Sequence, residues 1–299
     1  MIIVPGSSNA ALAYRLSREL GARLAKVEYR RFPDGERYVR VLDDVSGEDV
    51  IFLQSAALSP DEYLVESLLA LDYLKEFARS VTLVLSYFPY ARQDERFKPG
   101  EAVSLVTVSK LIRCLGVDRL VTVDVHRHRV LDMRSLVGVP YADASVMPHL
   151  ARYAADQGLV DVSRLVVVGP DAEAEQWAEL AARELGVPHA HLVKSRLGDR
   201  EVEVRVSGGI DVSGKDVLLV DDIISTGGTV REAARLLLGM GARKIVVGVA
   251  HALLVEDALV KILEDGVEEV FSSDTVPNPT TRVSAAPAIA AAIRSFGAG

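Results

Sequence analysis

The most constraining feature of this sequence is a repeated alternation between short apolar, β-branched runs and longer segments with helical periodicity. VIFLQ (50–54) is followed by YLVESLLALDYLKEFA (63–78) and then by VTLVLSYF (81–88). The same order returns where VLLVDDI (217–223) precedes VREAARLLLGMGA (230–242). Parallel strands need a long crossover between them, which is usually a helix. The alternation therefore predicts an α/β fold of repeated βα units with a mainly parallel sheet.

The same pattern extends over most of the chain. With 299 residues the chain is longer than a usual single domain, so two successive α/β domains fit better than one long sheet. Gly138 and Pro140 interrupt the pattern and place the boundary there, giving domains at 1–141 and 142–284. A final helix at 287–296 is a candidate to pack back on the first domain. The further expected strands are 120–126, 165–171 and 244–254, with another helix at 174–186.

Charge and cysteine content exclude several classes of protein. The formal net charge of −8 makes non-specific binding to nucleic acid or to an anionic membrane unfavourable, because both need a basic surface. Cys114 is the single cysteine and cannot form an internal disulfide, which fits a reducing cytoplasm. No apolar run reaches the roughly 18 to 20 residues of a membrane span. We therefore expect a cytoplasmic protein, without nucleic-acid or membrane partners, that binds phosphates only locally.

Polar or titratable residues recur where the expected strands end. In open α/β sheets, ligands bind beyond the carboxyl ends of the strands, so these side chains are expected along the edge that forms the site. They are Gln54, Asp124, His126, Asp171, Asp221, Asp222, His251 and Asp274.

The segment VLLVDDIISTGGTV (217–230) has the order of chemistry that a sugar phosphate requires. Its glycines permit close backbone approach, and N–H groups at a helix N-terminus with nearby hydroxyls can hold a phosphate. Asp221 and Asp222 would repel that phosphate, so they should accept hydrogen bonds from neutral hydroxyls or bind a divalent cation. A pentose 5-phosphate has this shape, whereas a plain strand, polar turn and capped helix is the alternative. The expected ligand-binding residues are Asp221, Asp222, Ser225, Thr226, Gly227, Gly228 and Thr229.

A second glycine-containing segment, GIDVSGKD (209–216), matches most of a nucleotide-binding P-loop. Asp216 stands where a Ser or Thr would bind Mg²⁺, and the segment precedes a strand instead of joining a strand to a helix. We therefore expect a surface turn here.

Residues 217–229 resemble the phosphoribosyl-binding signature of type I phosphoribosyltransferases and of the related ribose-phosphate pyrophosphokinase family. Five other segments resemble motifs of the pyrophosphokinases, in the same order along the chain. They are RFPDGERYVRV (31–41), YFPYARQDERFKPGE (87–101), VDVH (123–126), GPD (169–171) and HLVKSRLGDREVEV (191–204). The resemblance covers nearly the whole chain. It implies two tandem, similar, type I phosphoribosyltransferase-like domains, each a mainly parallel sheet flanked by helices.

The resemblance also implies a reaction. In the family, ATP gives its β,γ-diphosphoryl group to the 1-hydroxyl of ribose 5-phosphate, so the expected substrates are ATP and ribose 5-phosphate and the expected cofactor is Mg²⁺. A homo-oligomer built from dimers is the expected assembly. Two alternatives stay open: a phosphoribosyltransferase that consumes the activated sugar, and a noncatalytic regulatory homologue that binds nucleotides.

Residue roles follow from matching these motifs position by position. The implied ATP-binding residues are Phe32, Asp34, Glu36, Arg92, Gln93, Asp94 and His126. The implied metal-associated residues are His126 and Asp171, and the implied catalytic residues are Lys194 and Arg196. No diphosphate contacts are carried over to residues 172–175, because this chain has Ala-Glu-Ala-Glu where the family often has glycines.

Several of these residues have a second interpretation when taken alone. Phe32 equally fits core packing, and Asp34 with the following glycine fits a hairpin turn. Mg²⁺ prefers oxygen ligands, so His126 could be a hydrogen-bonded structural histidine. Lys194 and Arg196 could lie on a solvated face, although cations closing over a diphosphoryl group suit a transfer that depends on charge neutralisation.

Overall fold

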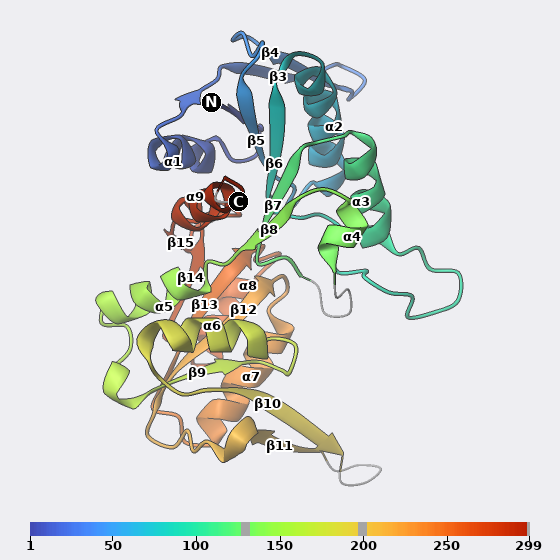
Figure 1. Ribbon diagram of the computed structural model, residues 1–299. Coiled ribbons are helices and arrows are strands. Elements are labelled where there is room, and N and C mark those ends of the chain that lie inside the picture. Colours follow the sequence, from blue (N-terminus) through green and yellow to red (C-terminus); the bar gives the residue numbers. More distant parts are fainter. Residues whose placement is uncertain (127–131, 197–201, 298–299) are drawn as a thin grey trace. The chain divides into compact units, whose positions relative to one another are not determined.

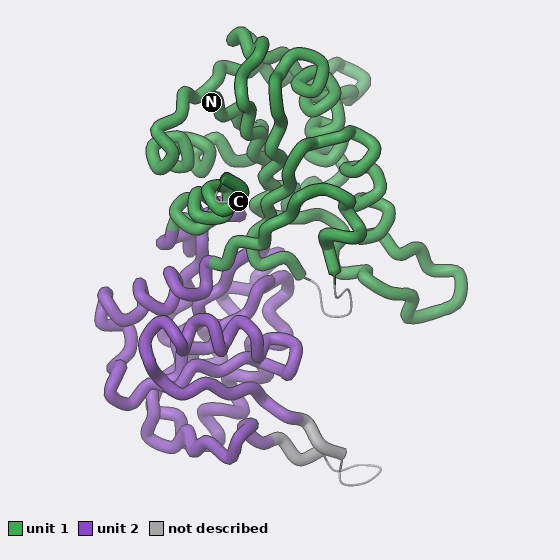
Figure 2. Tube along the Cα trace, in the orientation of Figure 1, with its two compact units in different colours: residues 1–145, 284–299 green, residues 146–283 purple. Residues whose placement is uncertain are grey.

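The computed structural model folds the chain into two compact units (Figure 1; Figure 2). It describes residues 1–126, 132–196 and 202–297, without the side chains of 194–196 and 202–204. Unit 1 comprises residues 1–145 and 284–299, and unit 2 comprises residues 146–283. The first unit thus continues to residue 145, where the sequence suggested 141, and it takes up the C-terminal helix.

Unit 1 contains a six-stranded parallel sheet in the order β2-β1-β5-β6-β7-β8. Helix α9 packs against α1, β7 and β8, which explains why the end of the chain belongs to this unit. The strands are β1 (Ile2–Pro5), β2 (Arg23–Leu24), β5 (Asp49–Ser55), β6 (Ser80–Tyr87), β7 (Arg119–Val123) and β8 (Tyr141–Ala144). The helices are α1 (Ala10–Leu20), α2 (Pro60–Phe77), α3 (Ser104–Cys114), α4 (Met133–Val137) and α9 (Ala286–Ser295).

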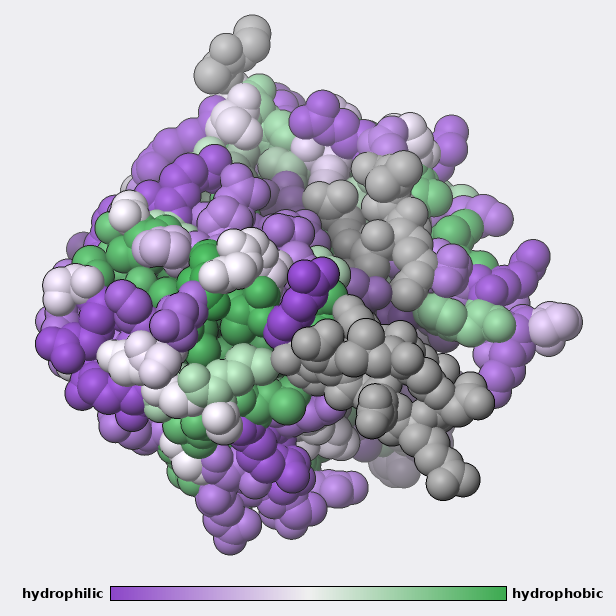
Figure 3. All heavy atoms as spheres, turned by 90° about the horizontal axis from the view of Figure 1, so that it is seen from below, coloured by the Kyte–Doolittle hydropathy of each residue, from purple (hydrophilic) through white to green (hydrophobic). Residues whose placement is uncertain are grey.

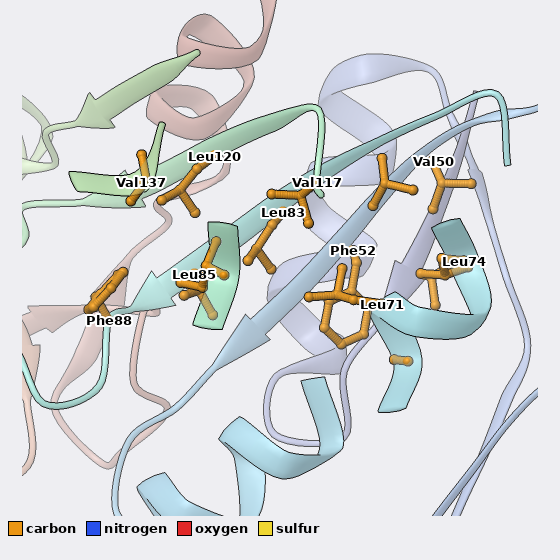
Figure 4. Close-up of a cluster of buried hydrophobic side chains, with 14 of the residues drawn as sticks. Val50, Phe52, Leu71, Leu74, Leu83, Leu85, Phe88, Val117, Leu120 and Val137 are labelled. Atoms are coloured by element: carbon orange, nitrogen blue, oxygen red, sulfur yellow. The ribbon is translucent and has the colours of Figure 1, made fainter. Parts of the chain in front are cut away.

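The core of unit 1 lies between the sheet and the helices that carry the chain from strand to strand. Phe52 pairs in register with Leu83, which pairs with Leu120, and all three side chains are buried together (Figure 4). Leu71 and Leu74 of α2 pack on the same cluster. Each such side chain contributes about 1.5 to 3 kcal/mol when it is buried. The uninterrupted apolar runs of the strands follow from having both faces of the sheet covered.

Helix α2 shows how local sequence sets an element's start. Pro60 occupies its first turn, where a missing N–H costs nothing, and Asp61 and Glu62 complement the positive end of the helix dipole. Lys75 stands in the last turn, near the negative end. The helix therefore begins three residues before the apolar periodicity does at Tyr63.

Unit 2 contains a seven-stranded sheet in the order β11-β10-β9-β12-β13-β14-β15, in which only the β10–β11 pair is antiparallel. The strands are β9 (Leu165–Gly169), β10 (His189–Arg196), β11 (Val202–Val206), β12 (Asp216–Ile224), β13 (Lys244–Ala252), β14 (Glu269–Ser273) and β15 (Thr281–Val283). The helices are α5 (Met147–Asp156), α6 (Glu175–Leu185), α7 (Gly228–Gly239) and α8 (Ala258–Glu264), with short 3-10 turns at Val162–Arg164 and Ser207–Gly209. The expected class, two α/β domains with mainly parallel sheets flanked by helices, is confirmed.

The P-loop-like segment 209–216 has a structural role. It forms the turn before β12, and Asp216 is fully buried at the start of that strand. Arg243 donates two hydrogen bonds of 2.6 Å to the Asp216 carboxylate, and the backbone N–H of Asp161 donates a third of 2.8 Å. This carboxylate ties β12 to the start of β13 and is not available to a nucleotide.

In the part of the chain that the structure describes, no helix is both long and apolar enough to cross a membrane. Figure 3 shows hydrophilic residues over most of the visible face, with hydrophobic residues gathered near its centre.

Candidate active site

The sugar-phosphate segment of unit 2 forms a strand, a tight turn and a helix, in the order expected. Strand β12 ends at Ile224, and α7 begins at Gly228 after a turn in which Gly227 has φ of 77°. A Cβ atom at Gly227 would lie 2.9 Å from Cδ1 of Ile262, so glycine is required both for space and for backbone conformation. Among the residues that the structure describes, no side chain caps α7. Its first N–H groups, which have no partner within the helix, are therefore available to an anion.

Two carboxylates stand at the end of β12, next to this turn. The backbone N–H of Asp222 donates to Oδ1 of Asp221 at 3.0 Å, and the N–H of Ile223 donates to Oδ1 of Asp222 at 2.8 Å. Burial, followed by repulsion from Asp222 and Asp171, raises the pKa of Asp221 well above its ordinary value. Burial also raises the pKa of Asp222 to about 7, even though hydrogen bonds from Asp221 and Ile223 lower it. The pair therefore favours a ligand that supplies hydroxyl donors or positive charge.

Asp171 follows β9 and organises its own loop. Its Oδ1 accepts hydrogen bonds from the backbone N–H groups of Glu173 at 2.9 Å and Ala174 at 3.1 Å. Residues 172–175 thus turn back on the Asp171 carboxylate and lead into α6. This arrangement uses one carboxylate oxygen for the loop, and repulsion from Asp171 still raises the pKa of both aspartates of β12.

Helix α7, strand β10 and the Asp171 loop line one cavity of about 290 Å³. Its volume is close to the lower end of the range for small-molecule sites. Asp171 borders it at the end of β9 and Thr229 borders it in the first turn of α7, so two separate motifs meet at the same hollow. The remaining lining residues are Pro170, Ala172, His191, Leu192, Val193, Glu232, Ala233 and Leu236.

In unit 1, residues 32–36 form the turn of a hairpin made by β3 (Val27–Arg31) and β4 (Arg37–Val41). The Glu36 backbone N–H donates to the Asp34 carboxylate at 3.2 Å, so the hairpin interpretation of this segment holds. Phe32 is 36% exposed and stacks edge-on with Tyr38, with their ring centres 5.9 Å apart. The core-packing interpretation of Phe32 is therefore wrong. The Arg30 guanidinium lies over both rings, 4.8 Å and 4.0 Å from their centres.

The motif residues 92–94 lie in the loop between β6 and α3. Arg92 is exposed, and its guanidinium has no partner among the residues that the structure describes. Gln93 is half-buried and donates from Nε2 to Glu95 O at 3.0 Å and to the Glu101 carboxylate at 3.1 Å. Asp94 is buried, with 6% of its surface exposed. Of these three side chains, that of Arg92 is the most accessible to solvent.

His126 follows β7 on unit 1 and is half-buried, whereas Asp171 lies on unit 2. Within residues 1–126, 132–196 and 202–297, no three His, Cys, Asp or Glu side chains gather in a metal-binding cluster. Lys194 and Arg196 occupy the end of β10, and their side chains lie outside the described part of the structure.

A buried carboxylate of helix α2 binds the strand-end residue Gln54, and the sequence did not suggest this partner. Glu66 of α2 is fully buried and accepts hydrogen bonds from Ser7 N at 3.0 Å, Ser7 Oγ at 2.7 Å and Gln54 Nε2 at 2.7 Å. Gln54 in turn accepts from Ser8 N at 3.2 Å. The Glu66 carboxylate is thus engaged by Ser7 and Gln54. Gln54 is consequently a structural residue, and no pattern in the sequence pointed to its partner.

Three other strand-end residues are also buried. His251 at the end of β13 is 1% exposed, and its Nδ1 lies 2.8 Å from Oγ1 of Thr275. Asp124 and Asp274 are each 2% exposed. The strand-end rule thus located the edge of each sheet correctly, but the side chains along it differ in exposure: Asp222 is 2% exposed, like Asp124 and Asp274, whereas Asp171 and Asp221 are half-buried.

A parallel α/β unit with an acidic pair and a glycine turn leading into a helix belongs to the phosphoribosyltransferase fold. Consistent with this class, residues 146–275 match the family model for the phosphoribosyl transferase domain. Residues 1–116 match the model for the N-terminal domain of ribose phosphate pyrophosphokinase. The chain belongs to the ribose-phosphate pyrophosphokinase family.

Similarity to individual members extends over the whole chain. A Methanopyrus kandleri protein named ribose-phosphate pyrophosphokinase is 40% identical over 297 residues, covering 99% of both chains. A Methanothermobacter thermautotrophicus protein of the same name is 40% identical over 97% of this chain and 98% of the relative. The crystal structure of phosphoribosylpyrophosphate synthetase from Mycobacterium smegmatis matches with a TM-score of 0.85 and 32% identity, covering 100% of this chain and 99% of the other. The family expected from the motifs is confirmed.

Proposed function

We propose that this chain transfers the β,γ-diphosphoryl group of ATP to the 1-hydroxyl of ribose 5-phosphate, giving phosphoribosyl pyrophosphate and AMP. The observation that carries this proposal is the full-length match to relatives named ribose-phosphate pyrophosphokinase, which includes the N-terminal domain that transferases lack. In the reaction the 1-hydroxyl oxygen bonds to the β-phosphorus. The bond from that phosphorus to the α,β-bridging oxygen breaks, AMP leaves, and the hydroxyl proton is released.

The acceptor half of the site is the β12 turn. The 5-phosphate is placed at the uncapped N-terminus of α7, against the N–H groups and hydroxyls of Thr226 and Thr229 and the backbones of Gly227 and Gly228. Ser225 lies in the same turn and is also proposed to contact the 5-phosphate. The ribose hydroxyls are placed against the β12 carboxylates, which accept hydrogen bonds in the ionised state. This orientation keeps the phosphate away from the two negative charges.

The donor half of the site is assigned to unit 1. Arg92 offers an exposed guanidinium for the nucleotide phosphates, and Gln93 and Asp94 support it in the same loop. The hairpin turn with Phe32, Asp34 and Glu36 is assigned to the adenine. An exposed aromatic ring stacks readily on a base, and neighbouring carboxylates accept from its amino group. His126 completes the proposed nucleotide contacts.

Lys194 and Arg196 are proposed to neutralise the diphosphoryl group as it transfers. Such a transfer needs little covalent help from the protein, and fixed positive charge at the developing anion accounts for most of the catalysis. Both positions lie at the end of β10, next in the sheet to the strand that leads to Asp171.

Mg²⁺ is proposed as the cofactor, associated with Asp171 and His126. Carboxylate oxygens are the ligands that Mg²⁺ prefers, and it is commonly held by one or two carboxylates together with substrate phosphates, so a cluster of three protein ligands is not required. Burial raises the pKa of both the Asp221 and Asp222 carboxyls, repulsion from Asp171 raises it further, and a nearby cation would favour their ionised forms. When bound, the ion would neutralise negative charge on the diphosphoryl group.

Two further properties belong to this proposal. The protein acts in the cytoplasm, as its single cysteine suggests, and it works as a homo-oligomer built from dimers. Size-exclusion chromatography with light scattering tests the second point, and a monomer at micromolar concentration would contradict it.

The test of the activity is a mass-spectrometric product assay with ATP, Mg²⁺ and ribose 5-phosphate. The proposal requires AMP and phosphoribosyl pyrophosphate to form together, and only when all three components are present. Release of free phosphate without AMP would contradict it. Nucleotide products from phosphoribosyl pyrophosphate and a panel of bases would instead indicate a phosphoribosyltransferase. ATP binding without any turnover would indicate a regulatory homologue.

A further inference from the structure

The loop of residues 88–103, between β6 and α3, is closed by one carboxylate. Oε2 of Glu101 accepts hydrogen bonds from Nε2 of Gln93 at 3.1 Å, from the backbone N–H of Phe97 at 2.9 Å and from the backbone N–H of Lys98 at 2.9 Å. Three donors, which lie three, four and eight positions before Glu101 in the sequence, therefore converge on a single oxygen. Hydrogen bonds to an ionised acceptor are stronger than those between neutral groups. We therefore expect the Glu101 carboxylate to contribute strongly to the conformation of the loop.

The backbone around Glu101 reinforces the closure. Its own N–H donates to Lys98 O at 3.3 Å, and Nε of Arg96 donates to its carbonyl oxygen at 3.0 Å. Gly100 has φ of 87°, a left-handed conformation that lets the chain reverse so that the Glu101 carboxylate returns to the N–H groups behind it.

Gln93 is fixed on every side by this arrangement. Its side-chain Nε2 donates to both Glu95 O and the Glu101 carboxylate. Its backbone carbonyl oxygen accepts from Leu105 N at 3.3 Å. Both hydrogens of the amide are thus directed into the loop. Among the described residues Oε1 of Gln93 has no partner, so it is the atom left to accept a hydrogen bond from a ligand.

We propose that Glu101 is a positioning residue that holds the 92–98 segment in the conformation that receives the nucleotide. The inference rests on the proposed function, because that function assigns the nucleotide to Arg92 and Gln93. Glu101 acts through Gln93 and through the two backbone N–H groups. It keeps its negative charge engaged by donors inside the loop, and the exposed Arg92 guanidinium then meets the phosphates.

Amide hydrogen exchange on the ligand-free protein tests the structural step. In Glu101→Ala the amides of Phe97 and Lys98 should exchange at least about tenfold faster than in the wild type, since each loses a bond to a charged acceptor. Glu101→Gln retains an acceptor oxygen and should show a smaller acceleration. Glu76→Ala removes an exposed glutamate from α2 and serves as the matched control. Wild-type exchange at both amides in Glu101→Ala would overturn the proposal.

ATP binding and kinetics test the link to the nucleotide. Glu101→Ala should raise the dissociation constant and the KM for ATP by at least about tenfold while kcat falls much less, because binding and not chemistry is disturbed. The effect should shrink in a Gln93→Ala background if Glu101 acts through Gln93. An unchanged ATP affinity together with faster amide exchange would limit Glu101 to a structural role and overturn the positioning claim. If the wild type binds ATP but forms no AMP, the proposed function fails while the binding and exchange results still decide this inference.

Discussion

The backbone N–H of Asp222 donates a 3.0 Å hydrogen bond to Oδ1 of Asp221, so the Asp221 carboxylate is held against the backbone of the next residue at the end of β12. Burial raises the pKa of both groups. Ionising these two buried carboxyls without a ligand therefore lowers the free energy of unfolding, and this effect can be measured as a pH dependence of stability.

The first prediction concerns stability against pH. A carboxyl whose pKa is raised in the folded protein contributes stability that is complete below its unfolded pKa of about 3.9 and is lost as pH rises through the folded value. For Asp222 the folded pKa is about 7. Asp222→Asn should therefore gain free energy of unfolding relative to the wild type as pH rises from 5 to 8, reaching on the order of 2 to 4 kcal/mol. Urea denaturation at several pH values measures this. Exposed Asp156→Asn should show no such trend, and a pH-independent gain in Asp222→Asn would contradict the assignment.

The same substitution should impair the acceptor half of the reaction. Asp222→Asn keeps the size of the side chain but loses a charged acceptor for a sugar hydroxyl, so the KM for ribose 5-phosphate should rise about tenfold and the KM for ATP much less. Steady-state AMP formation with each substrate varied in turn measures the two constants. Equal changes in both would place Asp222 elsewhere. A more stable but less active variant is the expected trade-off for a site residue.

Two neighbouring glycines of the turn should respond differently to alanine. Gly227→Ala places a Cβ 2.9 Å from Ile262 Cδ1 at a residue with φ of 77° and should lower the free energy of unfolding by about 1 to 3 kcal/mol. Gly228→Ala meets no atom within 4 Å and should leave stability within about 0.5 kcal/mol. Gly228→Ala should instead raise the KM for ribose 5-phosphate, because a methyl group then lies beside the helix N-terminus. Equal stabilities of the two variants would disprove the role given to Gly227.

Lys194→Ala should reduce turnover at least about a hundredfold, the usual scale for losing a charge contact in the transition state, with the fold intact. Circular dichroism and thermal unfolding check the fold, and AMP formation under saturating substrates gives kcat. Lys110→Ala, which removes an exposed lysine from α3, is the control. Near-normal turnover in Lys194→Ala would remove that residue from the mechanism.

The ion pair between Arg243 and the buried Asp216 carboxylate should contribute more to the free energy of unfolding than an ion pair between two exposed side chains. Burial raises the pKa of Asp216, but hydrogen bonds from Arg243 and the Asp161 N–H lower it further, so the net pKa lies below its ordinary value. Arg243→Ala leaves the Asp216 carboxylate buried without its charged partner, so at pH 7 it should lower the free energy of unfolding by more than Arg164→Ala does. Because the folded pKa is lowered, the contribution is lost as pH falls below about 3.9. Arg164→Ala breaks an exposed pair and should cost less than about 1 kcal/mol. Similar losses in the two variants would contradict this ranking.

Much of the fold could be anticipated because its signals are local. Apolar runs bounded by polar turns located the strands, and Pro60, Asp61 and Glu62 mark the start of α2 through backbone chemistry alone. The strand, turn and helix around Gly227 could also be predicted from the sequence, because a positive φ and close backbone approach both require glycine. Strand pairing confirmed the hairpin around Asp34, while the adenine contact of its turn stays a prediction.

The order of residues along the chain was sufficient to predict two α/β units, the glycine turn after β12 and the family, since these depend on short-range periodicity and contiguous motifs. Which polar side chains face a ligand depended instead on partners far away in sequence. Gln54 is bound to Glu66, Asp216 to Arg243, and Gln93 to Glu101, and each bond forms only when folding brings separate segments together. A buried polar group must find such a partner to offset its lost hydration, and the tertiary structure alone determines where that partner stands.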